Sequence, residues 1–153
     1  MNTAARERFR LVSAVHLFFT RDGEILLQRR CNTGYEDGNY SVPAGHLDGG
    51  ESVIHAAIRE AREEVGVEVP LDAIRAVGVM HWKAGDERID FFVEVSKWKG
   101  EIINSEPRKC DRLDWFRVSA LPTNTVPYIR RALQNYTSGT WFDCYGWDDA
   151  ATE

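Results

Sequence analysis

Three glutamates stand close together in the run Glu60-Ala61-Arg62-Glu63-Glu64. If the run is helical, at about 100° per residue, their side chains fall within an arc of roughly 100°. Carboxylates this close repel one another, by roughly 0.2–0.5 kcal/mol per pair on an open helix and by more when partly buried. A hard divalent cation removes the repulsion, because carboxylate oxygens are the ligands that Mg²⁺ prefers. Taken alone, the run is more typical of a solvated helix face on which Arg59 pairs with Glu63.

The element that must carry these glutamates is a helix. Ser52 is a suitable N-cap, and Gly66 is a suitable C-terminal stop. The apolar residues between them recur at helical spacing and predict the buried stripe: Ile54, Ala57, Ile58, Ala61 and Val65. The glutamates flank this stripe, so we expect them at the edge of the core. The preceding loop 45–50 is rich in glycine, which lets a backbone pass close to a phosphate or a metal.

A longer pattern surrounds the helix. It reads Gly45, five residues, Glu51, seven residues, and then Arg59-Glu60-Ala61-Arg62-Glu63-Glu64-Val65-Gly66-Val67. At every fixed position this resembles the signature of the Nudix hydrolase family, G-x5-E-x7-R-E-U-x-E-E-x-G-U, in which U is apolar. Ala61 is small for its U position but is still apolar. A chance match in a chain of this length has odds on the order of one in a million, so the resemblance outweighs the surface interpretation of the glutamates.

The resemblance implies an α/β fold, the Nudix α/β/α sandwich with a central mixed β-sheet, and a single domain over residues 1–153. Local patterns predict strands at 11–19, 25–27, 40–44, 73–82, 89–95 and 113–118. They also predict a loop at 31–39 and a second helix after Pro127. The tail, 137–153, is aromatic and acidic, and its pattern assigns it to no element.

The resemblance also implies roles within the motif. The metal ligands that it implies, for Mg²⁺ or Mn²⁺, are the backbone carbonyl of Gly45 and the carboxylates of Glu60, Glu63 and Glu64. Glu51 and Arg59 match a pair that joins loop to helix, and with the three glutamates they form the expected catalytic set. A metal-bound water has a lowered pKa, and a nearby carboxylate then takes its proton as the water attacks phosphorus. Which carboxylate acts as the base is left open.

A fourth carboxylate is expected from a distant loop. The run from Glu106 to Cys110, followed by Trp115, resembles the E-P-x-K-C…W segment of Nudix enzymes that cleave nucleoside triphosphates. Glu106 is therefore a candidate metal ligand. The alternative is a solvated loop acid beside Arg108 and Lys109.

Four further residues are candidates for contacts with the substrate: His46, Arg29, Arg30 and Trp82. The two arginines end the second predicted strand and could neutralise phosphates, and the histidine follows the first glycine of the motif. The tryptophan is one of several aromatic residues that could stack on a nucleobase. His16 and His81 are expected to be packing or surface residues instead.

The activity that the resemblance implies is Mg²⁺-dependent hydrolysis of a nucleoside diphosphate linked to another group. The Glu106 segment favours a nucleoside triphosphate that is cleaved to monophosphate and pyrophosphate. Nucleotide sugars, ADP-ribose, dinucleoside polyphosphates and capped RNA ends remain alternative substrates. Two other classes also remain: a non-catalytic nucleotide-sensing module, which usually lacks a motif glutamate, and an isoprenoid diphosphate isomerase, whose catalytic cysteine loop has no match here.

Composition bounds the partners. The 19 Lys and Arg against 24 Asp and Glu give a net charge of −5, which weighs against a protein that grips extended nucleic acid. A small phosphorylated ligand stays compatible, because a bound metal reverses the local charge. No apolar run approaches the ~20 residues of a membrane span, and the first ten residues lack a signal-peptide core. Three isolated cysteines are typical of the reducing cytoplasm, and the resemblance adds a homodimer as an expectation.

Overall fold

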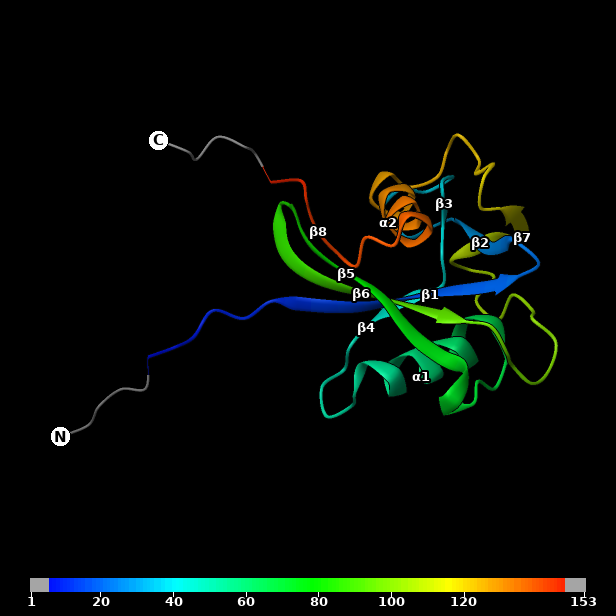
Figure 1. The fold of residues 1–153 in the computed structure, drawn as a ribbon, viewed down its shortest axis with the longest axis horizontal. Helices are drawn as coiled ribbons and strands as arrows, with labels where there is room; N and C mark the ends of the chain where they lie inside the picture. The colour runs from blue at the N-terminus through cyan, green and yellow to red at the C-terminus, as the bar shows by residue number, and fades with distance from the viewer. Residues whose placement is uncertain (1–5, 148–153) are drawn as a thin grey trace.

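The computed structural model describes residues 6–147, in which two helices cover a mixed β-sheet (Figure 1). The strands are β1 (Val12–Arg21), β2 (Glu24–Arg30), β3 (Tyr40–Ser41), β4 (Ala44–His46), β5 (Ile74–Ala84), β6 (Asp86–Val95), β7 (Cys110–Arg117) and β8 (Phe142–Tyr145). The helices are α1 (Val53–Val65) and α2 (Pro127–Ser138), and a 3₁₀ turn, η1, covers Leu71–Ala73.

Strand β1 organises the sheet because it pairs with three other strands. Residues 12–19 pair in parallel with β6, and residues 20–21 pair antiparallel with β2. On its other edge, residues 14–16 pair antiparallel with β4. The main path is β3-β2-β1-β6-β5-β8, with β7 paired to β2. Parallel β1–β6 and β5–β8 pairs therefore alternate with the antiparallel β5–β6 hairpin, so the sheet is mixed.

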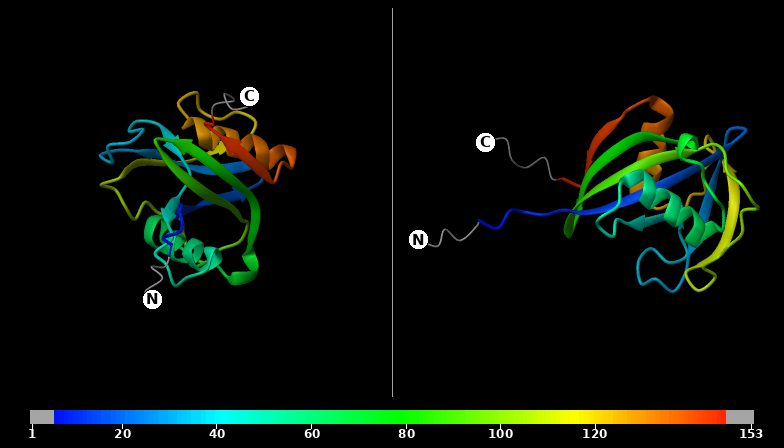
Figure 2. Two further views of the ribbon diagram at one scale, coloured as in Figure 1. Left: turned by 90° about the vertical axis from the view of Figure 1, so that its left-hand side faces the viewer. Right: turned by 90° about the horizontal axis from the view of Figure 1, so that it is seen from below.

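The helices lie on opposite faces of this sheet (Figures 1 and 2). Side chains along a strand alternate between faces. One face of β1 contributes Val15, Leu17 and Phe19 to a core packed with α1. The other face contributes Phe18 to a second core packed with α2. The α/β/α sandwich with a central mixed sheet, expected from the sequence, is thereby confirmed.

Most of the predicted elements are present, with differences at several boundaries: β6, for example, begins at Asp86, three residues before its predicted start at 89. The predicted strand 40–44 is divided into β3 and β4, because Pro43 has no N–H to donate and the two pieces pair with different strands. Strand β7 begins at Cys110, three residues before its predicted start at 113. The unassigned tail 137–153 contains the end of α2 and then β8, which pairs in parallel with β5, while residues 148–153 lie outside the described residues.

The cysteines are free thiols, as the sequence predicts: Cys31, Cys110 and Cys144. Cys110 is buried, and burial raises the pKa of its thiol to about 11, so it is a poor nucleophile at neutral pH. Within residues 6–147, neither helix has the length and apolar character that a membrane crossing requires.

Candidate active site

Helix α1 carries the three motif glutamates along the edge of its packed face. It begins after Ser52, whose side-chain oxygen accepts a hydrogen bond from the His55 N–H. It ends at Gly66, which adopts the left-handed conformation at φ 70° that favours glycine. The apolar stripe of the helix packs into the first core, and Glu60 follows it inward, with 7% of its surface exposed. The predicted helix is confirmed, and its first glutamate is buried.

Gly45 on β4 lies against the carboxylate of Glu60. A β-carbon at position 45 would overlap that carboxylate, although the backbone of Gly45 has an ordinary negative φ. The absence of a side chain, and not a special backbone conformation, is what this site requires. The loop backbone and the buried carboxylate are therefore as close together as their atoms allow.

Arg59 joins the loop to the helix. Its Nη2 donates to Glu51 Oε1 (2.7 Å) and to the carbonyl of His46 (3.0 Å), and its Nε donates to Glu51 Oε2 (3.1 Å). Its Nη1 donates to Glu60 Oε1 (2.6 Å) and lies 3.4 Å from Glu63 Oε2. The hydrogen bond to Arg59 is the main reason why the pKa of Glu51 falls to about 2. One guanidinium thus fixes the loop and orients two motif glutamates.

Glu64 turns into the protein beneath β4. Its Oε2 accepts hydrogen bonds from the Ala44 N–H (3.0 Å) and from Gln28 Nε2 (3.3 Å). Burial raises the pKa of Glu64 to about 8, and the negative charge of Glu60 adds to the shift. Burial also raises the pKa of Glu60, and the hydrogen bond from Arg59 opposes that rise. The carboxylates of Glu60 and Glu64 are consequently held in surroundings that disfavour their charged forms.

Glu106 approaches the same carboxylates from the loop before β7. Its N–H donates to Asn104 Oδ1 (3.1 Å), and its carbonyl accepts from the N–H groups of Lys109 and Cys110 (both 3.0 Å), which fixes the turn. Its negative charge contributes to the raised pKa of both Glu60 and Glu64. The carboxylate of Glu106 is therefore close enough to repel the carboxylates of Glu60 and Glu64.

These groups line one cleft of about 820 Å³ between β4, α1, the loop 31–39 and the loop before β7. Its acidic lining consists of Asp48, Glu60, Glu63, Glu64 and Glu106. Its basic lining consists of Arg30, Arg59, Arg88 and Lys109. Gly45 and His46 complete the wall on the motif side. Glu51 does not line the cleft and is joined to it through Arg59.

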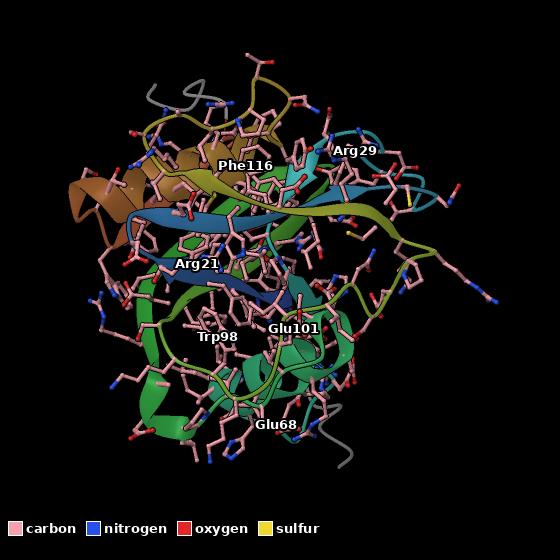
Figure 3. All side chains as sticks on the ribbon, turned by 90° about the vertical axis from the view of Figure 1, so that its right-hand side faces the viewer. Arg21, Arg29, Glu68, Trp98, Glu101 and Phe116 are labelled. Atoms are coloured by element: carbon pink, nitrogen blue, oxygen red, sulfur yellow. The ribbon has the colours of Figure 1, made fainter. Side chains whose placement is uncertain are left out.

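Of the four proposed substrate contacts, the structure brings two to the cleft. His46 and Arg30 line it, whereas Arg29 and Trp82 do not. Arg29 points to the other face of β2, where its Nε and Nη2 donate to Asp111 (2.7 and 2.9 Å) beside β7 (Figure 3). Trp82 is buried behind Tyr128, stacked on its ring at 4.6 Å. Neighbouring residues of β2 face opposite sides, so Arg30 lines the cleft and Arg29 does not.

Several residues that line the cleft were not predicted as site residues from the sequence. Gln28 lies two residues before Arg30 on β2, and the period of two could have placed it on the same face. His16 is a packing residue, as expected, because it is buried and stacks on Phe92 at 4.9 Å, and it also lines the cleft. Arg88 and Tyr128 join it from β6 and α2, and no local pattern marks them, because long-range strand pairing brings them there.

The carboxylates fit a divalent cation by their chemistry. Glu60, Glu63, Glu64 and Glu106 offer oxygen ligands only, which suits Mg²⁺ or Mn²⁺, and Gly45 lets the backbone carbonyl come near them. Among residues 6–147, no group of three or more His, Cys, Asp or Glu stands ready to hold an ion. Arg59 holds Glu60, and the Ala44 N–H holds Glu64. A cation would offset the burial that raises the pKa of both groups, so the ligand set fits once the side chains turn toward it.

Several known proteins are similar to this chain in sequence and fold. Residues 9–136 match the family model of the NUDIX domain. The chain is 35% identical over 114 residues to the NAD-capped RNA hydrolase NudC of Pseudomonas aeruginosa, covering 74% of this chain and 38% of that protein. The corresponding protein of Pseudomonas fluorescens is 37% identical over 114 residues, covering 74% and 39%. The chain thus spans less than two fifths of the curated relatives that it matches.

Solved structures with a similar fold are also found. The crystal structure of a MutT NUDIX hydrolase from Burkholderia pseudomallei superposes with a TM-score of 0.75 at 26% identity, covering 82% of this chain and 98% of that one. The solution structure of the E. coli ORF135 protein superposes with a TM-score of 0.72 at 22% identity, covering 84% and 90%, which supports the fold alone. The family model covers most of the chain and includes the whole carboxylate motif. The chain therefore belongs to the Nudix hydrolase family.

Proposed function

We propose that this protein hydrolyses a nucleoside diphosphate linked to another group, with Mg²⁺ or Mn²⁺ as cofactor. The observation that carries the proposal is the meeting of four glutamates at one cleft, with Gly45 packed against the most buried of them. Membership of the Nudix hydrolase family supports a pyrophosphohydrolase in general. The retention of every motif glutamate argues against a non-catalytic nucleotide-sensing module.

The glutamates of the cleft would have two roles, metal binding and proton transfer. Glu60, Glu63, Glu64 and the carbonyl of Gly45 would hold the cation, with Glu106 completing its ligands. A divalent cation bound there neutralises phosphate charge and lowers the pKa of water. One of the glutamates accepts a proton from the attacking water as its oxygen forms a bond to phosphorus. The anhydride P–O bond breaks, and its electron pair leaves with the departing phosphate group.

Arg59 and Glu51 would serve as positioning residues. Their ion pair, with atoms 2.7 Å apart, ties the glycine-rich loop to α1 and directs Arg59 Nη1 toward Glu60. In the same cleft, Arg30 and Lys109 supply positive charge for the phosphates. The positive side chains counter the charge of the substrate where the glutamates would otherwise repel it.

A nucleoside triphosphate, cleaved to monophosphate and pyrophosphate, is the substrate that we favour, because Glu106 lines the cleft together with the motif glutamates. A dinucleotide with a central diphosphate is the second candidate. It is favoured by relatives named as NAD-capped RNA hydrolases, which are 35–37% identical to the chain. ADP-ribose, nucleotide sugars and dinucleoside polyphosphates belong to the same chemical class.

A substrate panel tests the proposal. The purified protein is incubated with Mg²⁺ or Mn²⁺ and each nucleoside triphosphate, ADP-ribose, NAD, a nucleotide sugar, a dinucleoside polyphosphate and a short NAD-capped RNA, and the products are separated by chromatography. We expect monophosphate and pyrophosphate from a triphosphate, and two monophosphates from a dinucleotide. If no compound is hydrolysed with either metal, the enzyme proposal fails and the sensing module becomes the better explanation.

A further inference from the structure

A second polar cluster lies at the foot of the cleft, on the face of the sheet that packs toward α2. It is built around Asp90, a fully buried side chain on β6. Asp90 Oδ2 accepts a hydrogen bond from Trp82 Nε1 (2.5 Å), and Oδ1 accepts from Arg88 Nη2 (3.1 Å). His16 Nε2 lies 3.2 Å from Oδ2. Although burial opposes ionisation, these neighbours keep the pKa of Asp90 below its usual value, so the carboxylate is charged.

Two side chains of this cluster carry buried polar atoms that have no hydrogen bond within residues 6–147. These atoms are Nδ1 and Nε2 of His16 and Nε of Arg88, although Nε2 lies 3.2 Å from Asp90 Oδ2. Buried polar groups in folded proteins are almost always paired, because an unpaired one loses its hydration without compensation. The negative charge of Asp90 favours the histidine tautomer with its hydrogen on Nε2, which leaves Nδ1 as an acceptor. Arg88 Nε–H is a donor, so the foot of the cleft offers one of each.

The cluster is close to the motif glutamates. His16 and Arg88 line the same cleft as Glu60 and Glu64. His16 is paired in register with Ala44 on β4, and the N–H of Ala44 donates to Glu64. Adjacent strands lie about 4.8 Å apart, so the backbone of His16 is one strand spacing away from the backbone that holds Glu64. A ligand whose phosphates lie at the glutamates would extend directly over the cluster.

Charge and shape indicate which part of a ligand fits. The positive charge of Arg88 balances the negative charge of Asp90. A phosphate would meet no excess of positive charge there, whereas a neutral group with a donor and an acceptor meets complementary atoms. Aromatic rings surround the place: Tyr128 is edge-on to His16 at 5.6 Å, and Tyr35 also lines the cleft. A flat, neutral, hydrogen-bonding ring satisfies these conditions.

We propose that His16 and Arg88, both oriented by Asp90, bind the nucleobase of the substrate and determine which base is accepted. This inference rests on the proposed function, because it assumes that the phosphates occupy the glutamate side of the cleft. His16 and Arg88 contact the base, and Asp90 acts as a positioning residue through them. All four common bases present a donor beside an acceptor, so the cluster distinguishes among them by the order and spacing of these groups.

Binding measurements test the proposal without requiring turnover. Isothermal titration calorimetry, with Mg²⁺ present, compares each nucleoside monophosphate with ribose 5-phosphate, which carries the same sugar phosphate and no base. We expect the preferred monophosphate to bind the wild type at least tenfold more tightly than ribose 5-phosphate. In His16→Leu and Arg88→Met this ratio should fall toward one, while the affinity for ribose 5-phosphate changes less than threefold.

Matched variants separate the explanations. His81→Leu replaces a histidine that pairs with Glu87 outside the cleft lining and should keep the wild-type ratio. Glu63→Gln should lose turnover and keep the ratio. Arg88 is only half-buried, so Arg88→Met carries the test if His16→Leu unfolds.

Two outcomes overturn the proposal: a wild-type ratio near one, or an unchanged ratio in a folded variant. If the ratio is unchanged because both ligands bind equally more weakly, the cluster serves the phosphate and not the base. A normal ratio without any hydrolysis would refute the proposed function and leave base recognition standing.

Discussion

The packing of Gly45 against Glu60 makes Gly45→Ala a sharp perturbation. The backbone at position 45 has a negative φ, so alanine is allowed there by its backbone conformation. The new β-carbon, however, would overlap the carboxylate of Glu60, which must retreat by about 1.5 Å to restore an ordinary contact. Retreat also breaks or lengthens the hydrogen bond from Arg59 Nη1 to Glu60, now 2.6 Å. The substitution therefore acts on the site through one side chain.

The expected size follows from that displacement. A misplacement of about 1 Å in a catalytic group costs about 100-fold in rate. We therefore expect kcat/KM to fall about 100-fold, equal to about 2.7 kcal/mol of transition-state stabilisation. Weakening a charged, largely buried hydrogen bond costs about 1.5–3 kcal/mol, and the lower entropy of the unfolded alanine chain returns about 0.4–1 kcal/mol. The free energy of unfolding should fall by about 1–2 kcal/mol.

Steady-state hydrolysis of the best substrate and urea denaturation provide the two readouts. Gly78→Ala is the matched control, because a β-carbon there meets its nearest atom at 3.5 Å, an ordinary contact, outside the cleft lining. Adding Glu60→Asp to Gly45→Ala makes room for the new methyl group, so the double variant should lose less than the sum of the single losses. If Gly45→Ala keeps kcat/KM within threefold of the wild type, the position of Glu60 does not matter and the reasoning is wrong.

Three further predictions concern charge, metal and packing. Glu51→Gln should lower the free energy of unfolding at pH 6. This loss should shrink as the pH falls from about 4.5 toward 2, because the pKa of Glu51 is depressed to about 2 in the fold. If urea denaturation shows a constant difference between the variant and the wild type across this range, the Arg59 pair is unimportant. Mg²⁺ or Mn²⁺ at about 100 times its dissociation constant should stabilise the protein by about 2.7 kcal/mol in thermal unfolding, and an undiminished shift in Glu106→Gln would return Glu106 to a solvated loop role. Trp82→Phe removes the indole donor to buried Asp90 and should cost about 1–3 kcal/mol in urea denaturation, whereas Trp141→Phe, at an exposed position, should change stability by less than about 0.5 kcal/mol; equal effects would contradict the assigned hydrogen bond.

Local signals predicted the elements that local chemistry controls. Helix α1 follows from Ser52, Gly66 and the apolar stripe between them, all of which act within the helix itself. Strand β8 is the opposite case. It is a short, partly exposed edge strand, Phe142–Tyr145, and it is a strand because β5 lies beside it. Its sequence lacks the alternation of a buried face, so the pattern could not assign it.

The same distinction holds for the cleft. The motif has a fixed spacing along the chain, so the sequence alone predicts that Gly45 and the glutamates of α1 lie close together. For Arg29 and Arg30, the pattern of β2 does not show which face of the strand meets the cleft, because this depends on which core each face packs into: Leu26 lies in the core with α1 and Leu27 in the core with α2. The place of His16 in the cleft could not be predicted, because its partner Asp90 lies far away in the chain and reaches it through the parallel pairing of β1 with β6. Long-range strand pairing is the information that local patterns lack.

The central claim is that the glutamates of this cleft hold a cation that drives hydrolysis of a phosphoric anhydride. Its most direct test is the rate at which Glu63→Gln hydrolyses the best nucleotide at saturating Mg²⁺, relative to the wild type under the same conditions. Glu63 is half-exposed, with Arg59 Nη1 3.4 Å away, so the substitution leaves the core intact. We predict a loss of at least about 100-fold, the order expected when one charged group is removed from transition-state stabilisation. A folded Glu63→Gln variant that turns over at the wild-type rate would contradict the account.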